Sequence, residues 1–243
     1  MATERLPFEP VLSDKDRKRL AEFKKDVDRT DLLLEFDEYK KMAPVYERRK
    51  ALTKTIPKFW PVALLRHPSV KLEFEKREDV DAIQYLEHVD IKRDPKEPRA
   101  YTLEFTFGRN PYFEDSVLRK EFRYVEPKTR TQERADSEGF KWSMLDFDWE
   151  KDVKPQASRI RWKPGKDLSR KYPKEEDDGE VTELGSFFNW FTITSDPFDL
   201  GVIIGEEIFP DAIGYFTGDI HGPDSDDDDD DNSDDDDDDD DSD

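Results

Sequence analysis

The chain has no cysteine, only three histidines and only ten glycines among 243 residues. Without thiols it can form neither a disulfide nor a thiolate metal site, which agrees with a reducing compartment. Its longest aliphatic run, Leu200–Gly205, is far shorter than a membrane span, and the amino terminus has no apolar signal segment. These absences predict a soluble intracellular protein.

Motifs that carry catalysis are also missing. His67, His88 and His221 stand apart in the sequence, and no HExxH, GxSxG, GxGxxG or phosphate-binding loop occurs. His67 is expected at a loop or a helix end. We therefore predict no enzymatic activity, no catalytic residue and no cofactor.

Negative charge is abundant and lies mostly in one place. Asp224–Asp243 reads DSDDDDDDNSDDDDDDDDSD and holds 16 of the 62 acidic residues and no base, so the rest of the chain carries only about −6 of the net −22. Such a segment cannot be buried, because each carboxylate would need a partner charge. We predict a disordered tail over residues 223–243 that attracts a polycation, with Asp226 and Asp234 among the contact residues.

A run of carboxylates can also bind calcium, which is the alternative to a polycation. The tail lacks the spaced ligands and the glycine that shape an EF-hand loop, so the sequence favours a polycation and predicts no metal site.

The first ordered element is expected to be one long helix from Ser13 to Ile56. SDKD at its start resembles a capping box, and apolar residues then recur at steps of mostly three or four. Pro44 should kink this helix. Because the apolar stripe exceeds what one domain would cover, we predict a dimerisation helix. The predicted dimer contacts are Leu20, Phe23, Val27, Leu34, Met42 and Val45. The alternative is two helices, broken near Pro44, that pack on their own domain.

The pattern changes from helical to alternating after Pro57. Tyr101–Phe107 and Val117–Val125 alternate apolar and polar residues, which predicts an antiparallel pair with one solvated face. Leu86–Lys92 and Arg159–Trp162 are expected to be further strands. Residues 127–157 are expected to form an inserted loop or an extra hairpin.

Helical patterns return from Ser186 to Phe209, so the expected fold class is α+β. The predicted units are residues 1–56 with the long helix, an α+β domain over 57–222, and the acidic tail.

Several ordered blocks resemble the SET/NAP family of nucleosome assembly proteins. They span roughly Asp26 to Phe216 and read KTIPKFWPVALLRHPSV (Lys54–Val70), FGRNPYFEDSVLRKEF (Phe107–Phe122), IRWKPGKDL (Ile160–Leu168), SFFNWFTITSD (Ser186–Asp196) and DLGVIIGEEIFPDAIGYF (Asp199–Phe216). The resemblance implies a homodimer joined by an antiparallel pair of long helices, with two "earmuff" α+β domains whose undersides bind histones. The long segment Pro127–Pro155 points to a fungal SET-like member, of the subgroup that partners a histone acetyltransferase.

The same resemblance places histone-binding acids in the helical segment after SFFNWF. The matching positions are Asp196, Asp199, Glu206, Glu207 and Asp211. Each of them can instead be a solvated or capping acid, above all Asp196 and Asp199. The aromatic residues of SFFNWF are expected in the core; they are Phe187, Phe188, Trp190 and Phe191.

These features together lead us to expect a nuclear histone chaperone that shuttles with the cytoplasm. Its expected partners are core histones, a second copy of the chain and a histone acetyltransferase, with no direct nucleic-acid or membrane contact. The alternative function is an acidic inhibitor or cofactor protein that docks on an enzyme such as a phosphatase.

Overall fold

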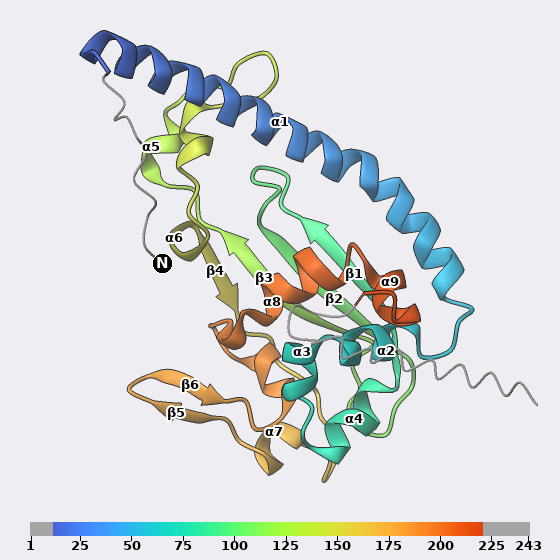
Figure 1. Ribbon diagram of the computed structural model, residues 1–243. Coiled ribbons are helices and arrows are strands. Elements are labelled where there is room, and N and C mark those ends of the chain that lie inside the picture. The colour runs from blue at the N-terminus through green and yellow to red at the C-terminus, as the bar shows by residue number, and fades with distance from the viewer. Residues whose placement is uncertain (1–11, 221–243) are drawn as a thin grey trace, which may run out of the picture.

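A long helix lies beside an α+β domain in the computed structural model, which describes residues 12–220 (Figure 1). The acidic tail, with Asp226 and Asp234, lies outside the described residues. The expected fold class, a long amino-terminal helix followed by an antiparallel sheet and carboxy-terminal helices, is confirmed.

Helix α1 (Asp14–Thr53) is continuous over 40 residues. Its amino-terminal cap is Ser13, whose hydroxyl accepts a hydrogen bond from the Asp16 amide at 3.2 Å. The helix runs through Pro44, so the alternative of two helices broken there is wrong. An isolated proline removes only one backbone donor, and the neighbouring turns keep theirs. The helix ends three residues before Ile56, in a tighter turn that precedes Pro57.

Four antiparallel strands form the central sheet in the order β1-β2-β3-β4. β1 spans Leu86–Arg93, β2 spans Tyr101–Phe107, and β3 spans Val117–Tyr124. The first three strands therefore match their predicted ranges to within one residue. Alternation identified them because one sheet face is buried and the other carries solvated pairs such as Glu104 with Arg119.

The fourth strand was predicted in the wrong place. β4 is Val153–Gln156, whereas Trp162, in the predicted strand, makes only an isolated bridge to Phe113. β4 contains a proline, Pro155, which an edge strand tolerates because the missing amide costs it little of its ladder. The strand contains a proline and only one buried apolar residue, Val153, so its sequence shows no alternation of apolar and polar residues.

The insertion before β4 forms short helices and no hairpin. They are α5 (Lys128–Thr131), the 3-10 helix η1 (Trp142–Asp146) and α6 (Trp149–Asp152). The insertion packs against α1, where the Arg29 guanidinium pairs with Asp136 at 2.7 Å. It therefore connects the amino-terminal half of α1 to the domain.

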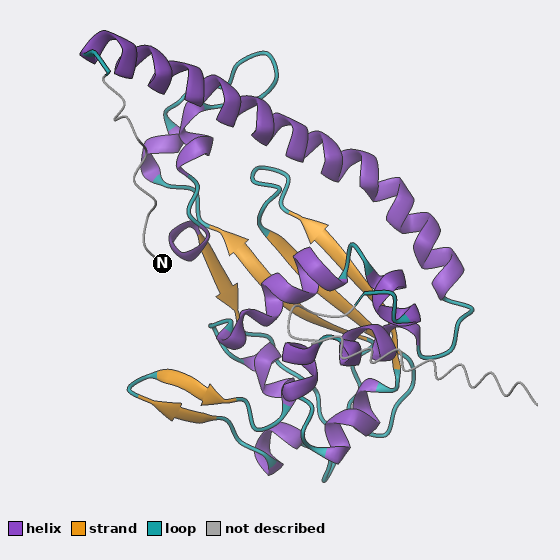
Figure 2. Cartoon of the chain, viewed as in Figure 1, coloured by secondary structure: helices purple, strands orange, loops and turns teal. Residues whose placement is uncertain are grey.

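A separate two-stranded hairpin, β5 (Glu175–Asp177) and β6 (Glu180–Glu183), projects from the domain at the end away from α1 (Figures 1 and 2). Its turn residues Asp178 and Gly179 have φ values of 49° and 86°. Asp-Gly is a recognised hairpin signal that the surrounding charges obscured. Short helices complete the domain on its lower side; they are α2 (Phe59–Arg66), α3 (Pro68–Leu72), α4 (Arg77–Ile83) and α7 (Leu168–Lys171).

The core lies between the sheet and the carboxy-terminal helices. These are the 3-10 helices η2 (Phe187–Thr192) and η3 (Pro197–Asp199), α8 (Leu200–Val202), the π-helix η4 (Ile203–Ile208) and α9 (Ala212–Thr217). All four aromatic residues of SFFNWF are fully buried, as expected.

Candidate functional site

The acidic residues of interest lie on a ridge formed by α8, η4 and α9 above the buried face of the sheet. Two glycines bring this ridge close to the strands. A Cβ atom at Gly201 would lie 1.9 Å from the ring of Phe122, and one at Gly205 would lie 2.7 Å from the Tyr101 hydroxyl. The Tyr101 hydroxyl also donates to the Gly201 carbonyl at 3.0 Å. The ridge backbone is therefore held directly on the sheet.

The π-helical turn of η4 separates buried from exposed side chains. Ile204 and Ile208 are fully buried, whereas the consecutive residues Glu206 and Glu207 are exposed. The Phe209 amide donates to the Ile204 carbonyl at 2.9 Å, five residues back. Such π-bulges are rare and occur frequently at functional sites.

Glu206 and Glu207 point to different neighbours within the chain. The Glu206 carboxylate lies 3.4 Å from the guanidinium of Arg93, at the end of β1. The Glu207 carboxylate lies 3.4 Å from Nε2 of His67, which lies between α2 and α3 and is buried. Both contacts are long, and the side chains of Glu206 and Glu207 are 38% and 44% exposed. Such exposed pairs contribute little stability, so the two carboxylates can change partner at low cost.

Asp199 and Asp211 are the uncommitted acids of the ridge. Each stands at the cap position before a short helix, α8 and α9 respectively, but neither side chain caps the helix with a hydrogen bond. Both residues are exposed. Their carboxylates are thus available to a ligand in solution.

Asp196 has a different setting from the other acids. Its carboxylate accepts hydrogen bonds from Trp190 Nε1 at 2.6 Å and from the Gly201 amide at 2.9 Å. Burial raises the pKa of this carboxyl, while the two hydrogen bonds oppose the rise. Asp196 therefore joins η2 to α8, and its side chain makes no cap hydrogen bond to η3, the helix that it precedes.

A buried lysine beside Asp196 was not singled out by the sequence. The Lys120 ammonium donates to the carbonyls of Trp190, Ile193 and Ser195, each at 2.8 Å. Burial lowers the pKa of Lys120 to about 8. Lys120 stands on the apolar side of β3, between Leu118 and Phe122, and so interrupts the alternation of that strand. This interruption is the feature of the sequence that could have identified it as a buried lysine.

The outer side of α1 carries an apolar stripe that the chain itself leaves uncovered. Arg29, Leu32 and Phe36 face the domain, as their ion pairs, burial and ring contacts indicate. At 3.6 residues per turn, the stripe lies roughly 140° to 200° around the helix from Phe36. Its exposed members are Leu20, Phe23, Val27, Leu34, Val45 and Leu52.

Met42 is the one predicted dimer contact that lies away from this stripe. It is half-buried and lines a groove between α1 and β1.

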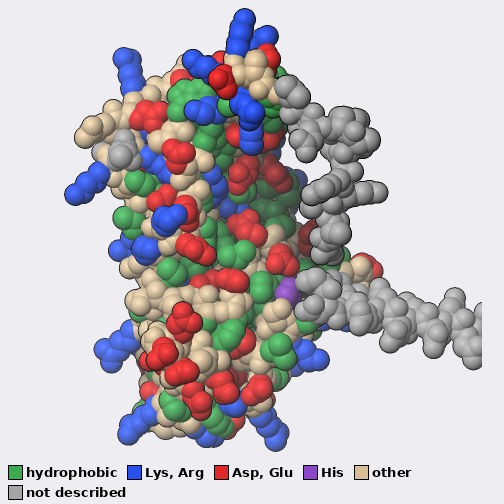
Figure 3. All heavy atoms as spheres, turned by 60° about the vertical axis from the view of Figure 1, so that its left-hand side comes forward, with side chains coloured by type: hydrophobic (Ala, Val, Ile, Leu, Met, Phe, Trp, Pro, Cys, Tyr) green, Lys and Arg blue, Asp and Glu red, His purple; other side chains and the backbone are tan. Residues whose placement is uncertain are grey.

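In the view of Figure 3, acidic side chains are spread down the surface, and most lysines and arginines stand at its margins.

Within residues 12–220, no group of histidine and carboxylate side chains is arranged to hold a metal ion. Over the same residues, no helix combines the length and apolarity that a membrane span requires.

Comparison with known proteins gives a consistent result. The family described as "Nucleosome assembly protein (NAP)" matches residues 12–219. NAP1-related protein 2 of Oryza sativa subsp. indica is 30% identical over 192 residues, which cover 75% of this chain and 67% of that protein. Protein SET of Drosophila melanogaster is 31% identical over 180 residues, which cover 71% of this chain and 60% of that protein. The chain thus spans about two thirds or less of the length of these curated relatives.

Two crystal structures share the fold. That of Ccp1 is 26% identical with a TM-score of 0.62 and covers 84% of this chain and 95% of its own. That of the Vps75 histone chaperone is 19% identical with a TM-score of 0.59, covers 85% of this chain and 98% of its own, and so bears on the fold alone.

Proposed function

The chain belongs to the nucleosome assembly protein family, and from this membership we propose that it is a non-enzymatic histone chaperone. It binds core histones, shields their positive charge from non-specific DNA contacts, and passes them to nucleosome assembly or to a modifying enzyme such as an acetyltransferase. This work takes place in the nucleus, with passage through the cytoplasm.

The observation that carries this proposal is the acidic ridge. Glu206, Glu207, Asp199 and Asp211 are exposed on a backbone that two glycines hold against the sheet. Fixed carboxylates can form charge-assisted hydrogen bonds with histone arginine and lysine side chains in a set geometry. A site of this kind binds with less ordering cost than a flexible polyanion does.

The working unit is a homodimer joined through the outer stripe of α1. The inner side of α1 packs on its own domain, and six further apolar residues remain exposed on its outer side. An exposed apolar surface of this kind is typical of a protein–protein interface. A second α1 packed against this stripe buries it and leaves both acidic ridges open. The acidic residues of the segment 224–243 add further negative charge to each copy of the chain.

The test of the ridge is a double charge reversal, Glu206→Lys with Glu207→Lys, in a chain that ends at residue 223. Titration with labelled histone H2A–H2B and H3–H4 should show affinity weakened by about 1 to 3 kcal/mol, the scale of hydrogen bonds to charged groups. The matched control is Asp177→Lys with Glu180→Lys on the exposed β5–β6 hairpin, which makes the same change of charge. The proposal fails if the ridge and hairpin variants bind histones equally well while both keep the parent's melting temperature.

A further inference from the structure

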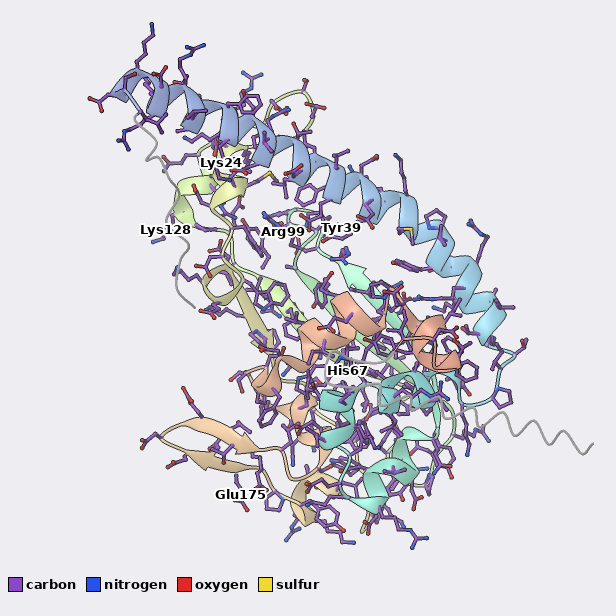
Figure 4. All side chains as sticks on the ribbon, viewed as in Figure 1. Lys24, Tyr39, His67, Arg99, Lys128 and Glu175 are labelled. Carbon is purple, nitrogen blue, oxygen red and sulfur yellow. The ribbon has the colours of Figure 1, made fainter. Side chains whose placement is uncertain are left out.

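A groove of about 730 Å³ runs between α1 and the β1 edge of the sheet. This volume lies within the range of sites that bind ligands. Apolar side chains from both walls form the floor; they are Phe36, Met42, Tyr46 and Phe209. Figure 4 shows Tyr39 between α1 and the sheet, among the residues that line the groove.

Within residues 12–220, β1 has no partner strand on the side that faces this groove. β1 is an edge strand, and its other side pairs with β2. The Asp94 amide donates to the Ala100 carbonyl, so Asp94, Lys92 and Asp90 point their backbone groups toward β2. Because such pairing alternates, Ile91 and Arg93 turn theirs outward.

The outward amide of Ile91 donates to its neighbour's carboxylate, Asp90 Oδ1, at 3.0 Å. The amide of Arg93 has no partner among the described residues. An edge with unpaired amides and carbonyls is a template for another strand.

The walls of the groove are acidic. Six acidic and three basic residues line it. Two of the bases are already paired, Lys92 with Asp90 at 2.6 Å and Arg93 with Glu206 at 3.4 Å. Glu38 and Glu47 on α1 are exposed and make no ion pair within residues 12–220. A basic occupant therefore complements the groove in charge.

We propose that this groove binds an extended, lysine- and arginine-rich segment of a histone, which adds to the sheet as a strand beside β1. The identity of the segment rests on the proposed histone-chaperone function. In an added strand, alternate side chains face the apolar floor and the acidic rims, and the backbone pairs with Ile91 and Arg93. Since the groove lies inside α1 and the apolar stripe outside it, dimerisation leaves the groove open.

The probe is the fluorescent peptide KVRVKVRV, used with the full chain. Two further versions carry N-methyl groups, one on the valine amides and one on the lysine and arginine amides. Strand addition uses one edge of the peptide, so one methylated version should bind at least tenfold more weakly and the other within threefold of the parent. Equal affinities of the two methylated peptides would overturn the proposal.

Two measurements place the peptide in the groove. Hydrogen exchange of the Arg93 amide should slow at least tenfold at saturating peptide. Glu47→Lys should weaken peptide binding at least fivefold, whereas Glu180→Lys on the distant hairpin should change it less than twofold. Unchanged Arg93 exchange, or equal effects of the two variants, would contradict the proposal.

Titration of the same proteins with intact core histones separates the two hypotheses. If histones bind and the peptide results are negative, the strand-addition site is wrong and the chaperone function stands. If the peptide results are positive and histones do not bind, the groove is a strand-addition site and the chaperone function is wrong.

Discussion

Arg93 is the residue that connects the acidic ridge to the groove beside α1. Its guanidinium stacks 3.5 Å from the ring centre of Tyr39, donates to the Pro98 carbonyl at 3.0 Å and lies 3.4 Å from the Glu206 carboxylate. If Glu206 binds histones as proposed, Arg93 in the free protein occupies the position that a histone cation would take.

Removing this internal cation should increase affinity for histones. Arg93→Gln is expected to tighten histone binding by about 0.5 to 1 kcal/mol, because Glu206 would no longer exchange one cation for another. The control is Arg123→Gln, which removes a cation paired with Glu121 on the other strand face. Histone titration at fixed salt measures both. Weaker binding by the Arg93 variant, with an unchanged melting temperature, would contradict this role.

Asp79 links stability to pH. It is fully buried and accepts hydrogen bonds from the Ser186 hydroxyl at 2.6 Å and from the Phe187 amide at 3.1 Å. Burial raises its pKa from 3.8 to about 6. A raised carboxyl pKa contributes stability that is present below the unfolded value and is lost as the pH rises through the folded one.

Stability relative to Asp79→Asn should therefore fall between pH 4 and pH 6. The expected loss is about 1 to 3 kcal/mol, since one pKa unit corresponds to about 1.4 kcal/mol. Urea unfolding of both proteins across this pH range measures it. A constant difference between wild type and variant would show that Asp79 keeps its ordinary pKa in the fold.

Among the helices and strands, α1 carries the apolar stripe through which we propose that two copies of the chain pack. Leu34 is 62% exposed and lies on the outer side of the helix. Leu34→Asp should convert the dimer to monomers at micromolar concentration, because the carboxylate would be buried in an apolar seam. Ala21→Asp, an exposed position outside the stripe, is the matched control. Light scattering on a sizing column distinguishes the masses, and a wild-type mass of 28.7 kDa would refute the dimer outright.

Sequence patterns identified the elements that bury one face and missed those that do not. β2 and β3 show alternating periodicity because one side of each meets apolar neighbours. α1 shows helical periodicity through its exposed outer stripe, which the proposed dimer would bury. β4 has one buried apolar residue, and the hairpin of β5 and β6 has none, so neither carries such a signal. Strands held mainly by backbone pairing leave no such pattern in the sequence.

The sequence predicted that Glu206 and Glu207 are exposed, but it did not predict which residues they pair with. The apolar residues around Glu206 and Glu207 indicated that these acids face outward. Their partners Arg93 and His67 lie 113 and 140 residues away in the chain, and no local pattern connects such positions. In the sequence, Asp196 resembles the other acids that follow SFFNWF. Its partial burial depends on the packing of η2 against the sheet, which brings Trp190 to its carboxylate.

At the scale of the whole molecule, 16 of the 62 acidic residues lie in the tail of residues 224–243, outside the described residues, and four exposed ones lie on the ridge. Removing this tail should slow histone association and reduce its salt dependence, because exposed charges act over a Debye length of about 8 to 10 Å. Stopped-flow association over a salt series tests this. Complete loss of histone binding without the tail would mean that the folded domain has no site of its own.

A plasmid supercoiling assay with purified core histones shows whether this chain chaperones histones. At a salt concentration where histones alone precipitate on DNA, the full chain should introduce stoichiometric supercoils in the presence of topoisomerase. The variant with Glu206→Lys and Glu207→Lys that lacks the tail should introduce few or none. If the full chain yields no more supercoils than histones with bovine albumin, it is not a histone chaperone.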